Sequence, residues 1–257
     1  MTVRTLYNFI DEIAPFCNQD PSDNSGLLVG DYEAKVSKVL VSLDLTRNVA
    51  REAVDTGVDL IIIHHPYMHR PVSEQASDDL LSALASNNIN LIAAHTNMDV
   101  AVGGIADIML EKLEFPKSDT VILPINPDGT GYGRIVKLTS PTSAVALAEK
   151  CKIAFGCKTV CYTDSGKPIT KIGVTSGSAE ESVETALNAG CDAFICGEVC
   201  YDRTLFATDH SLTLIEAGHF HTEDIFCDDL VRKLKTQFKE IGVEKSVNSV
   251  DVCEYVI

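Results

Sequence analysis

The stretch KVLVSLDLTRNVAREAVDTGVDLIIIHH, residues 38–65, decides the fold. It opens with a short run rich in β-branched residues, which favours a strand. The segment 46–56 then carries apolar residues at helical spacing, and 59–63 is a second strand-sized apolar run. Strand, helix and strand in this order predict a βαβ unit with parallel strands.

A second stretch, KIGVTSGSAEESVETALNAGCDAFICGE at 171–198, aligns with the first without a gap, each residue pairing with the one 133 places later. Identical residues include Lys38 and Lys171, Gly57 and Gly190, and Asp59 and Asp192. We therefore predict an internal duplication, although Ala, Gly and Ile recur in any βαβ unit and chance similarity is the alternative.

Further strand-sized apolar runs and helical patterns alternate along the rest of the chain. The runs lie at 90–94, 121–125, 133–138 and 212–216, and the helical patterns at 78–86, 103–114, 142–154 and 222–241. They predict an α/β fold of two similar α/β subdomains related by the duplication. The turn-rich NPDGTGYG at 126–133 is the best candidate boundary, giving halves 1–125 and 126–257 that form one compact unit.

A second pair of segments combines an apolar strand with a histidine and an acid four residues later. LIAAHTNMD (91–99) contains His95 and Asp99, and LIEAGHFHTE (214–223) contains His219 and Glu223. Ligands in α/β folds gather at the carboxyl ends of strands, where all these side chains and the His64-His65 pair are expected.

Six of the seven histidines fall in three short blocks, each just after an expected strand. Imidazole and carboxylate are the ligands that suit iron, zinc or manganese, so the clustering predicts a metal site. The expected ligands are His64, His65, Asp99, His219 and Glu223. The alternative is a set of hydrogen-bonded polar residues at strand ends. His69, His210 and His221 are weaker candidates.

The neighbouring pair His64-His65 favours two metal ions over one. Adjacent side chains of an extended segment point to opposite faces, so each histidine is expected to bind its own ion, with a carboxylate bridging the two. His219 and Glu223, four residues apart, would share one face of a helix. His95 could serve as a ligand, as a residue that orients a ligand, or as a proton carrier.

The composition excludes some classes of function. The 257 residues carry a net charge of −16, from 21 Lys and Arg against 37 Asp and Glu, which argues against nucleic acid as a partner. No signal peptide or membrane-spanning stretch is expected. Nine cysteines without a C-x-x-C pair fit core thiols in a reducing cytoplasm, and the spacing of Cys191, Cys196 and Cys200 matches no zinc or iron–sulfur motif.

Several motifs together resemble one known family over nearly the whole chain: the Nif-three-like dinuclear metal-centre proteins, also called GTP cyclohydrolase one, type two homologues. They are DNSGLLVGD (23–31), SLDLT (42–46), DLIIIHHP (59–66), AHTNMD (94–99), GYGRIVKL (131–138), GCDAFICGE (190–198) and AGHFHTE (217–223). At 257 residues the chain resembles the short form without an inserted domain.

The resemblance implies two divalent metal ions per subunit, with iron, zinc or manganese all open. It implies the same five ligands, with Glu223 as the bridge and His95 beside the centre. It also implies a ring-like homohexamer with the metal sites facing an internal cavity. The chain departs from the family at Ser22, where members commonly have Trp, and at Asp202, where they commonly have His. The second departure bears on any transferred reaction more than on the metal site.

Two hypotheses for the function follow. In the first, the protein is a metal-dependent hydrolase acting on a small molecule, with a nucleotide as one candidate and His95 transferring a proton. The chain has no phosphate-binding glycine motif of its own, and Lys35, Lys38, Arg47 and Arg70 are the nearby basic residues. In the second, it is a non-catalytic metal-binding scaffold, chaperone or interaction protein.

Overall fold

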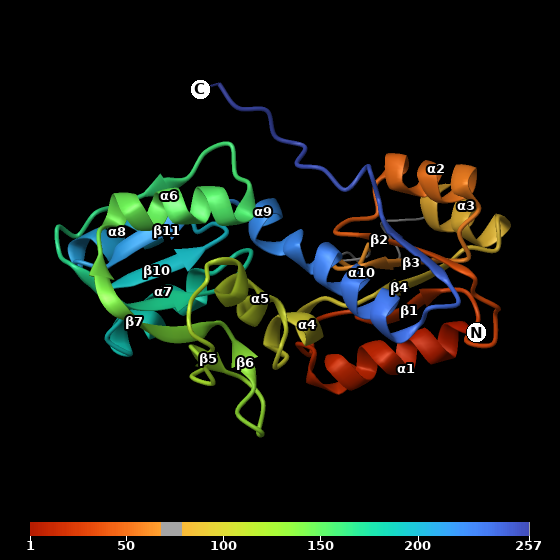
Figure 1. The fold of residues 1–257 in the computed structure, drawn as a ribbon, viewed down its shortest axis with the longest axis horizontal. Coiled ribbons are helices and arrows are strands. Elements are labelled where there is room, and N and C mark those ends of the chain that lie inside the picture. Colours follow the sequence, from red (N-terminus) through yellow and green to blue (C-terminus); the bar gives the residue numbers. More distant parts are fainter. Residues whose placement is uncertain (68–78, 257) are drawn as a thin grey trace. The chain divides into compact units, whose positions relative to one another are not determined.

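The computed structural model describes residues 1–67 and 79–256, which fold into two compact units (Figure 1). The first unit comprises Met1–Ala101 and Phe226–Val250, and the second comprises Val102–Ile225 with the residues from Asp251 onward. The expected break at residue 125 therefore lies inside the second unit. His69 and Arg70, which the sequence singled out, lie outside the described residues.

The first unit contains a five-stranded sheet in the order β1-β4-β3-β2-β12, in which β1 is antiparallel to β4 and the other pairs are parallel. Its strands are β1 (Gly26–Val29), β2 (Lys38–Ser42), β3 (Leu60–Ile63), β4 (Asn90–Ala93) and β12 (Gly242–Lys245). Its helices are α1 (Val3–Ile13), α2 (Arg47–Thr56), α3 (Asp79–Ser86), α4 (Thr96–Val100) and α10 (Ile225–Gln237), with a 3₁₀ turn at Phe16–Asn18.

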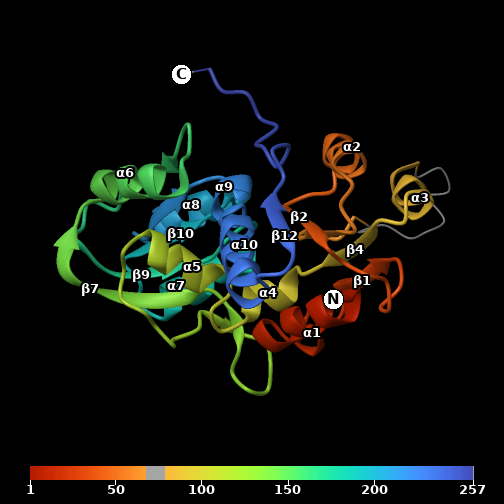
Figure 2. The ribbon, with the colours of Figure 1, turned by 45° about the vertical axis from the view of Figure 1, so that its right-hand side comes forward.

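Helices cover both faces of this sheet. The alternate strand residues Leu40, Ile61 and Leu91 pack with Val49 of α2 and Leu84 of α3 in one buried cluster. The intervening strand residues are buried as well, and α1 and α10 lie on that side (Figures 1 and 2). Because both faces are covered, the strands read as continuous apolar runs rather than as an alternating pattern.

Local signals define the ends of α2. The Thr46 hydroxyl accepts a hydrogen bond from the Val49 N–H at the start of the helix, as a capping residue does. Gly57 ends the helix in the left-handed region, with φ +63°, and its N–H bonds to carbonyls of the last turn. The sequence therefore places this helix within one residue of its observed start.

The second unit contains a five-stranded sheet in the order β7-β9-β10-β11-β8, with parallel pairing among β9, β10 and β11 and antiparallel strands at both edges. Its strands are β7 (Arg134–Thr142), β8 (Cys161–Tyr162), β9 (Ile169–Val174), β10 (Ala193–Cys196) and β11 (Thr213–Glu216), and β5 (Leu123–Pro124) pairs with β6 (Gly131–Tyr132). Its helices are α5 (Ile105–Lys112), α6 (Ala144–Phe155), α7 (Glu180–Asn188), α8 (Tyr201–Asp209) and α9 (His219–Glu223).

The core of the second unit is built as in the first. Val183 of α7 and Ala207 of α8 pack with Phe194 and Leu214 of the sheet in one buried cluster. The thiols Cys151, Cys157, Cys191 and Cys196 are buried, as expected for core cysteines. Burial raises the pKa of the Cys151 thiol to about 12, so this thiol stays protonated and unreactive.

The two units repeat the predicted strand–helix–strand in detail. Val39 lies opposite Leu60 in the first sheet, and the residues 133 places later, Ile172 and Ala193, lie opposite each other in the second. Two aspartates also make equivalent hydrogen bonds at the start of the first strand. Asp59 accepts the N–H groups of Ser37 and Lys38, and Asp192 accepts those of Thr170 and Lys171. The aligned residues thus occupy equivalent places in the two units.

The α/β fold class is confirmed, whereas the boundary of the units differs from the sequence interpretation. The first sheet takes its edge strand β12 from near the C-terminal end of the chain, and α10 returns to the first unit with it. GVEK at 242–245 is too short and too charged to read as a strand, and only its pairing with β2 makes it one. Within the described ranges, the helices are too short or too polar to span a bilayer.

A buried ion pair links α5 to β7 in the second unit. Arg134 is only 2% exposed, and its guanidinium donates to both carboxylate oxygens of Asp107, at 3.1 and 2.9 Å. The same guanidinium donates to the Gly133 carbonyl at 2.8 Å. The pair joins the segment after α4 to the sheet.

Asp107→Ala should lower the free energy of unfolding by about 3 kcal/mol, because it removes the carboxylate from a buried guanidinium. The double variant Asp107→Ala/Arg134→Met should recover part of this loss, because it removes the buried charge as well. Urea denaturation measures both. A double variant no more stable than Asp107→Ala would show that the buried charge is not the cause.

Candidate metal centre

His64 and His65 lie just beyond the end of β3, where the chain bends. Both backbone N–H groups donate to the Leu43 carbonyl at 3.1 Å, which draws the two residues against the end of β2. Their rings are neighbours, with centroids 4.9 Å apart and planes inclined by 51°. The expectation that they point to opposite faces was therefore wrong. The alternation of a strand applies only to Ile63, the last residue of β3.

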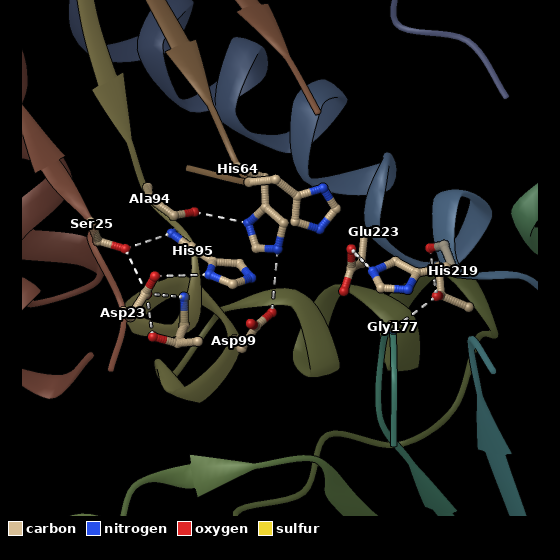
Figure 3. Close-up of polar contacts among 12 residues, drawn as sticks. Asp23, Ser25, His64, Ala94, His95, Asp99, Gly177, His219 and Glu223 are labelled. Carbon is tan, nitrogen blue, oxygen red and sulfur yellow. Dashed lines mark hydrogen bonds and ion pairs between the residues drawn. The ribbon is translucent and has the colours of Figure 1, made fainter. Parts of the chain in front are cut away.

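Each of these rings is oriented by a hydrogen bond from its Nδ1 atom. His64, fully buried, donates to the Ala94 carbonyl at 2.8 Å (Figure 3), and His65 donates to an Asp44 carboxylate oxygen at 2.8 Å. A carbonyl or carboxylate accepts only, so Nδ1 carries a hydrogen, and in the neutral ring Nε2 keeps the lone pair. This is the arrangement that fixes a histidine as a metal ligand through Nε2.

His95 and Asp99 complete the group in the first unit. His95 follows β4, and its ring centroid lies 5.1 Å from that of His64 and 5.4 Å from that of His65. One ligand atom from each of the three rings lies within 4.8 Å of the others. Asp99, one helical turn after His95 on α4, has Oδ1 3.6 Å from Nε2 of His64 (Figure 3). The first unit thus gathers three imidazoles and a carboxylate.

A buried aspartate pairs with His95. Burial by itself would raise the pKa of Asp23, but hydrogen bonds from His95 and Thr96 outweigh it and hold that pKa below its usual range. Burial lowers the pKa of His95, yet the hydrogen bond to Asp23 and the negative charge of Asp99 raise it overall. The hydrogen bond between Asp23 and His95 therefore favours the ionised form of the carboxylate and raises the basicity of the ring.

His219 and Glu223 form the group in the second unit. They occupy the first and last positions of α9, and Nε2 of His219 lies 2.9 Å from Oε2 of Glu223, as their spacing predicted. Nδ1 of His219 lies 2.9 Å from Oε1 of Glu198. The preceding Gly218 has φ +89°, a conformation that favours glycine, and its N–H donates to the Gly197 carbonyl.

The backbone of Gly177 lies directly against the side chains of His219 and Glu223. Its φ is +57°, and its N–H donates to the Thr222 hydroxyl at 3.1 Å. A Cβ atom at this position would lie 2.1 Å from Oε1 of Glu223 and 3.2 Å from Nε2 of His219. Only glycine therefore leaves room for the Glu223 carboxylate where it lies (Figure 3).

The donor set of both groups consists of imidazole nitrogens and carboxylate oxygens, which fits a divalent ion such as zinc, iron or manganese. Two weaker candidates lie apart from it. His210 is exposed, with Nδ1 donating to the Phe206 carbonyl, and His221 lies 3.2 Å from Asp251. The ring of His221 thus pairs with the C-terminal segment of its own unit.

Sequence reasoning assigned no role to four residues that shape these groups: Asp23, Asp44, Gly177 and Glu198. Asp23 and Asp44 stand in the motifs DNSGLLVGD and SLDLT, which were quoted only for their resemblance. Nothing in the neighbourhood of Asp23 in the sequence shows that it contacts His95, 72 residues later.

Comparison with known proteins identifies the family. The model of the Duf34/NIF3 (NGG1p interacting factor 3) family matches residues 1–252. A protein of Clostridium perfringens named "GTP cyclohydrolase 1 type 2 homolog" is 34% identical over 230 residues, which cover 87% of each chain. A protein of the same name from Clostridium acetobutylicum is 32% identical over 96% of this chain and 94% of its own length. The chain belongs to the Duf34/NIF3 family.

Solved structures show the same fold. The hypothetical protein SA1388 of Staphylococcus aureus matches with a TM-score of 0.90 and 24% identity, covering 100% of this chain and 99% of its own. A Bacillus cereus protein related to NIF3 also gives 0.90, at 18% identity and the same coverage. Both units of the chain therefore occur in these solved structures as well.

Proposed function

We propose that the groups in the two units act together as one dinuclear metal centre. The ligands would be His64, His65, Asp99, His219 and Glu223, with Glu223 bridging two divalent ions of iron, zinc or manganese. Each group alone contains too few side chains for two ions, and both lie at the carboxyl ends of parallel strands, where α/β folds bind ligands.

One observation carries this proposal. In His64, His65, His95 and His219 alike, Nδ1 is hydrogen-bonded to an oxygen atom, of a backbone carbonyl in one ring and of a carboxylate in three. Such a partner fixes the ring and directs Nε2 to a metal. Histidines placed for packing alone have no need of such a partner, and all four of these rings have one.

We propose further that the centre serves hydrolysis. The ions, when bound, would supply Lewis acidity that lowers the pKa of water and polarises a scissile bond. His95, which lies beside His64 and His65 and is hydrogen-bonded to Asp23, would move a proton during the reaction. Relatives carry the name "GTP cyclohydrolase 1 type 2 homolog", so nucleotides are the first substrates to test.

The test compares metal-loaded, chelated and His95→Ala protein on a panel of nucleotides, including GTP, and phosphoesters. We expect turnover with metal-loaded protein, loss of turnover on chelation, and a large decrease in kcat for His95→Ala. His210→Ala is the matched control, because this exposed histidine follows the end of α8 and belongs to none of the side-chain groups that could hold a metal. Metal-loaded protein that turns over no member of the panel would favour the non-catalytic, scaffold alternative.

We also propose a homohexamer with a cytoplasmic location. The assembly rests on the resemblance to the family, and the location on buried thiols such as Cys151 and Cys157. Native mass spectrometry should give six times the 27.8 kDa chain mass, and cell fractionation should place the protein in the cytoplasm. A monomeric mass at micromolar concentration would contradict the assembly.

Finally, we propose that the two units descend from one duplicated βαβ segment. Support comes from the equal register of the β2–β3 and β9–β10 pairs and from the equivalent hydrogen bonds of Asp59 and Asp192. Alignment of residues 38–65 with 171–198 across many relatives tests this. Similarity no greater than that between unrelated βαβ units would contradict common descent.

A further inference from the structure

The Asp23 carboxylate is held from several sides in the loop before β1. Its side chain is 2% exposed. Oδ1 accepts the Asn24 N–H at 2.7 Å, and Oδ2 accepts the Ser25 hydroxyl at 2.9 Å and the Thr96 N–H at 3.1 Å. The Thr96 hydroxyl donates to Oδ2 as well. So many donors leave the carboxylate a single orientation.

This fixed carboxylate holds His95 at its ring. Nδ1 of His95 lies 3.0 Å from Oδ1 of Asp23, and the backbone N–H of His95 donates to the Ser25 hydroxyl at 3.0 Å (Figure 3). Ser25 thus accepts from His95 while it donates to Asp23. Both the backbone and the ring of His95 are tied to the same loop.

His95 differs from its two neighbours in the kind of partner it has. The Nδ1 atom of His64 meets a backbone carbonyl, and that of His65 meets Asp44, whose side chain is 49% exposed. Of these three rings, that of His95 is the one whose Nδ1 partner is a buried carboxylate. A buried, fully hydrogen-bonded carboxylate imposes one tautomer and one ring orientation more strongly than an exposed one.

We propose that Asp23 is the positioning residue of His95. It holds the ring in the Nδ1–H tautomer and turns Nε2 toward the rings of His64 and His65. The importance of this role rests on the proposed function, in which His95 serves the metal centre with an unprotonated Nε2. The geometry itself lies within the first unit and involves no bound ion.

Asp23→Asn should change the tautomer of His95, because an amide has one acceptor oxygen and one donor nitrogen where the carboxylate has two acceptor oxygens. The Oδ2 position faces three donors, from Ser25 and from the N–H and hydroxyl of Thr96, whereas Oδ1 faces one donor besides His95, the Asn24 N–H. The amide oxygen should therefore take that position, and the NH₂ group should face Nδ1 of His95. The ring must then accept at Nδ1 and carry its hydrogen on Nε2.

The experiment reads the tautomer of His95 in the full-length, chelated protein at a pH where the ring is neutral. Long-range ¹H–¹⁵N spectra of ¹⁵N-histidine-labelled protein distinguish the two tautomers, and the signals missing from His95→Gln assign the ring. We expect the Nδ1–H tautomer in the wild type and a change to mostly Nε2–H in Asp23→Asn. Asp44→Asn, beside His65, is the matched control and should leave the His95 tautomer unchanged.

Two results would overturn the inference: an Nε2–H tautomer of His95 in the wild-type protein, or an unchanged Nδ1–H tautomer in a folded Asp23→Asn variant. The wild-type spectrum decides the first even if the variant does not fold. Metal content, measured separately on the same proteins, keeps the two proposals distinct. A wild type that binds no metal contradicts the proposed function, whatever the tautomer.

Discussion

Gly177→Ala is expected to reduce bound metal from about two ions per chain to one or none. The added Cβ would lie 2.1 Å from Oε1 of Glu223, so the carboxylate or the backbone of residue 177 must move. The φ of +57° adds about 1–2 kcal/mol of strain for any residue with a side chain. Both effects displace the carboxylate that the proposed centre needs as its bridge. Elemental analysis of the purified variant measures the result.

Gly156→Ala separates the two causes. Gly156 ends α6 at φ +69°, and a Cβ there would have nothing within 4 Å. It should therefore lose stability by a similar amount from strain while keeping its full metal content. If Gly177→Ala bound as much metal as Gly156→Ala, the space beside Glu223 would not matter for the centre.

Glu223→Gln is expected to lower metal content to one ion or none with little change in folding. Glutamine has the size and shape of glutamate, so packing around this residue, which is 4% exposed, is preserved. The amide lacks the negative charge and the second carboxylate oxygen needed to bridge two cations. Elemental analysis and thermal unfolding of the same sample separate metal loss from misfolding.

Glu184→Gln is the control for this variant. It makes the same chemical change at an exposed position of α7 in the same unit. Its metal content should match the wild type. Two ions retained by Glu223→Gln would contradict the bridging role, even if the other ligands were correct.

Much of the fold could be predicted because its parallel strands are buried on both faces. LIII at 60–63 and AFIC at 193–196 are apolar throughout, and both form strands where expected. Other elements lack such a signal. The edge strand β12 exists because β2 offers it a partner, and β8 is two residues long beside β11. The position of β12 is also the reason that the two units do not divide the chain at one point.

The candidate site was predictable where the spacing is local and unpredictable where it is not. His219 and Glu223 meet because they lie four residues apart on a helix. The opposite-face argument for His64 and His65 failed, because the strand ends before them and both N–H groups turn to Leu43. The contact between Asp23 and His95 spans 72 residues, and periodicity carries no information at that distance.

The most direct test of the central claim is the metal content of the wild-type protein purified without chelator. Elemental analysis should find about two ions of iron, zinc or manganese per chain, and both should be removable by a strong chelator with loss of thermal stability. Folded protein that contains no such metal and takes up none when it is supplied would contradict the dinuclear centre.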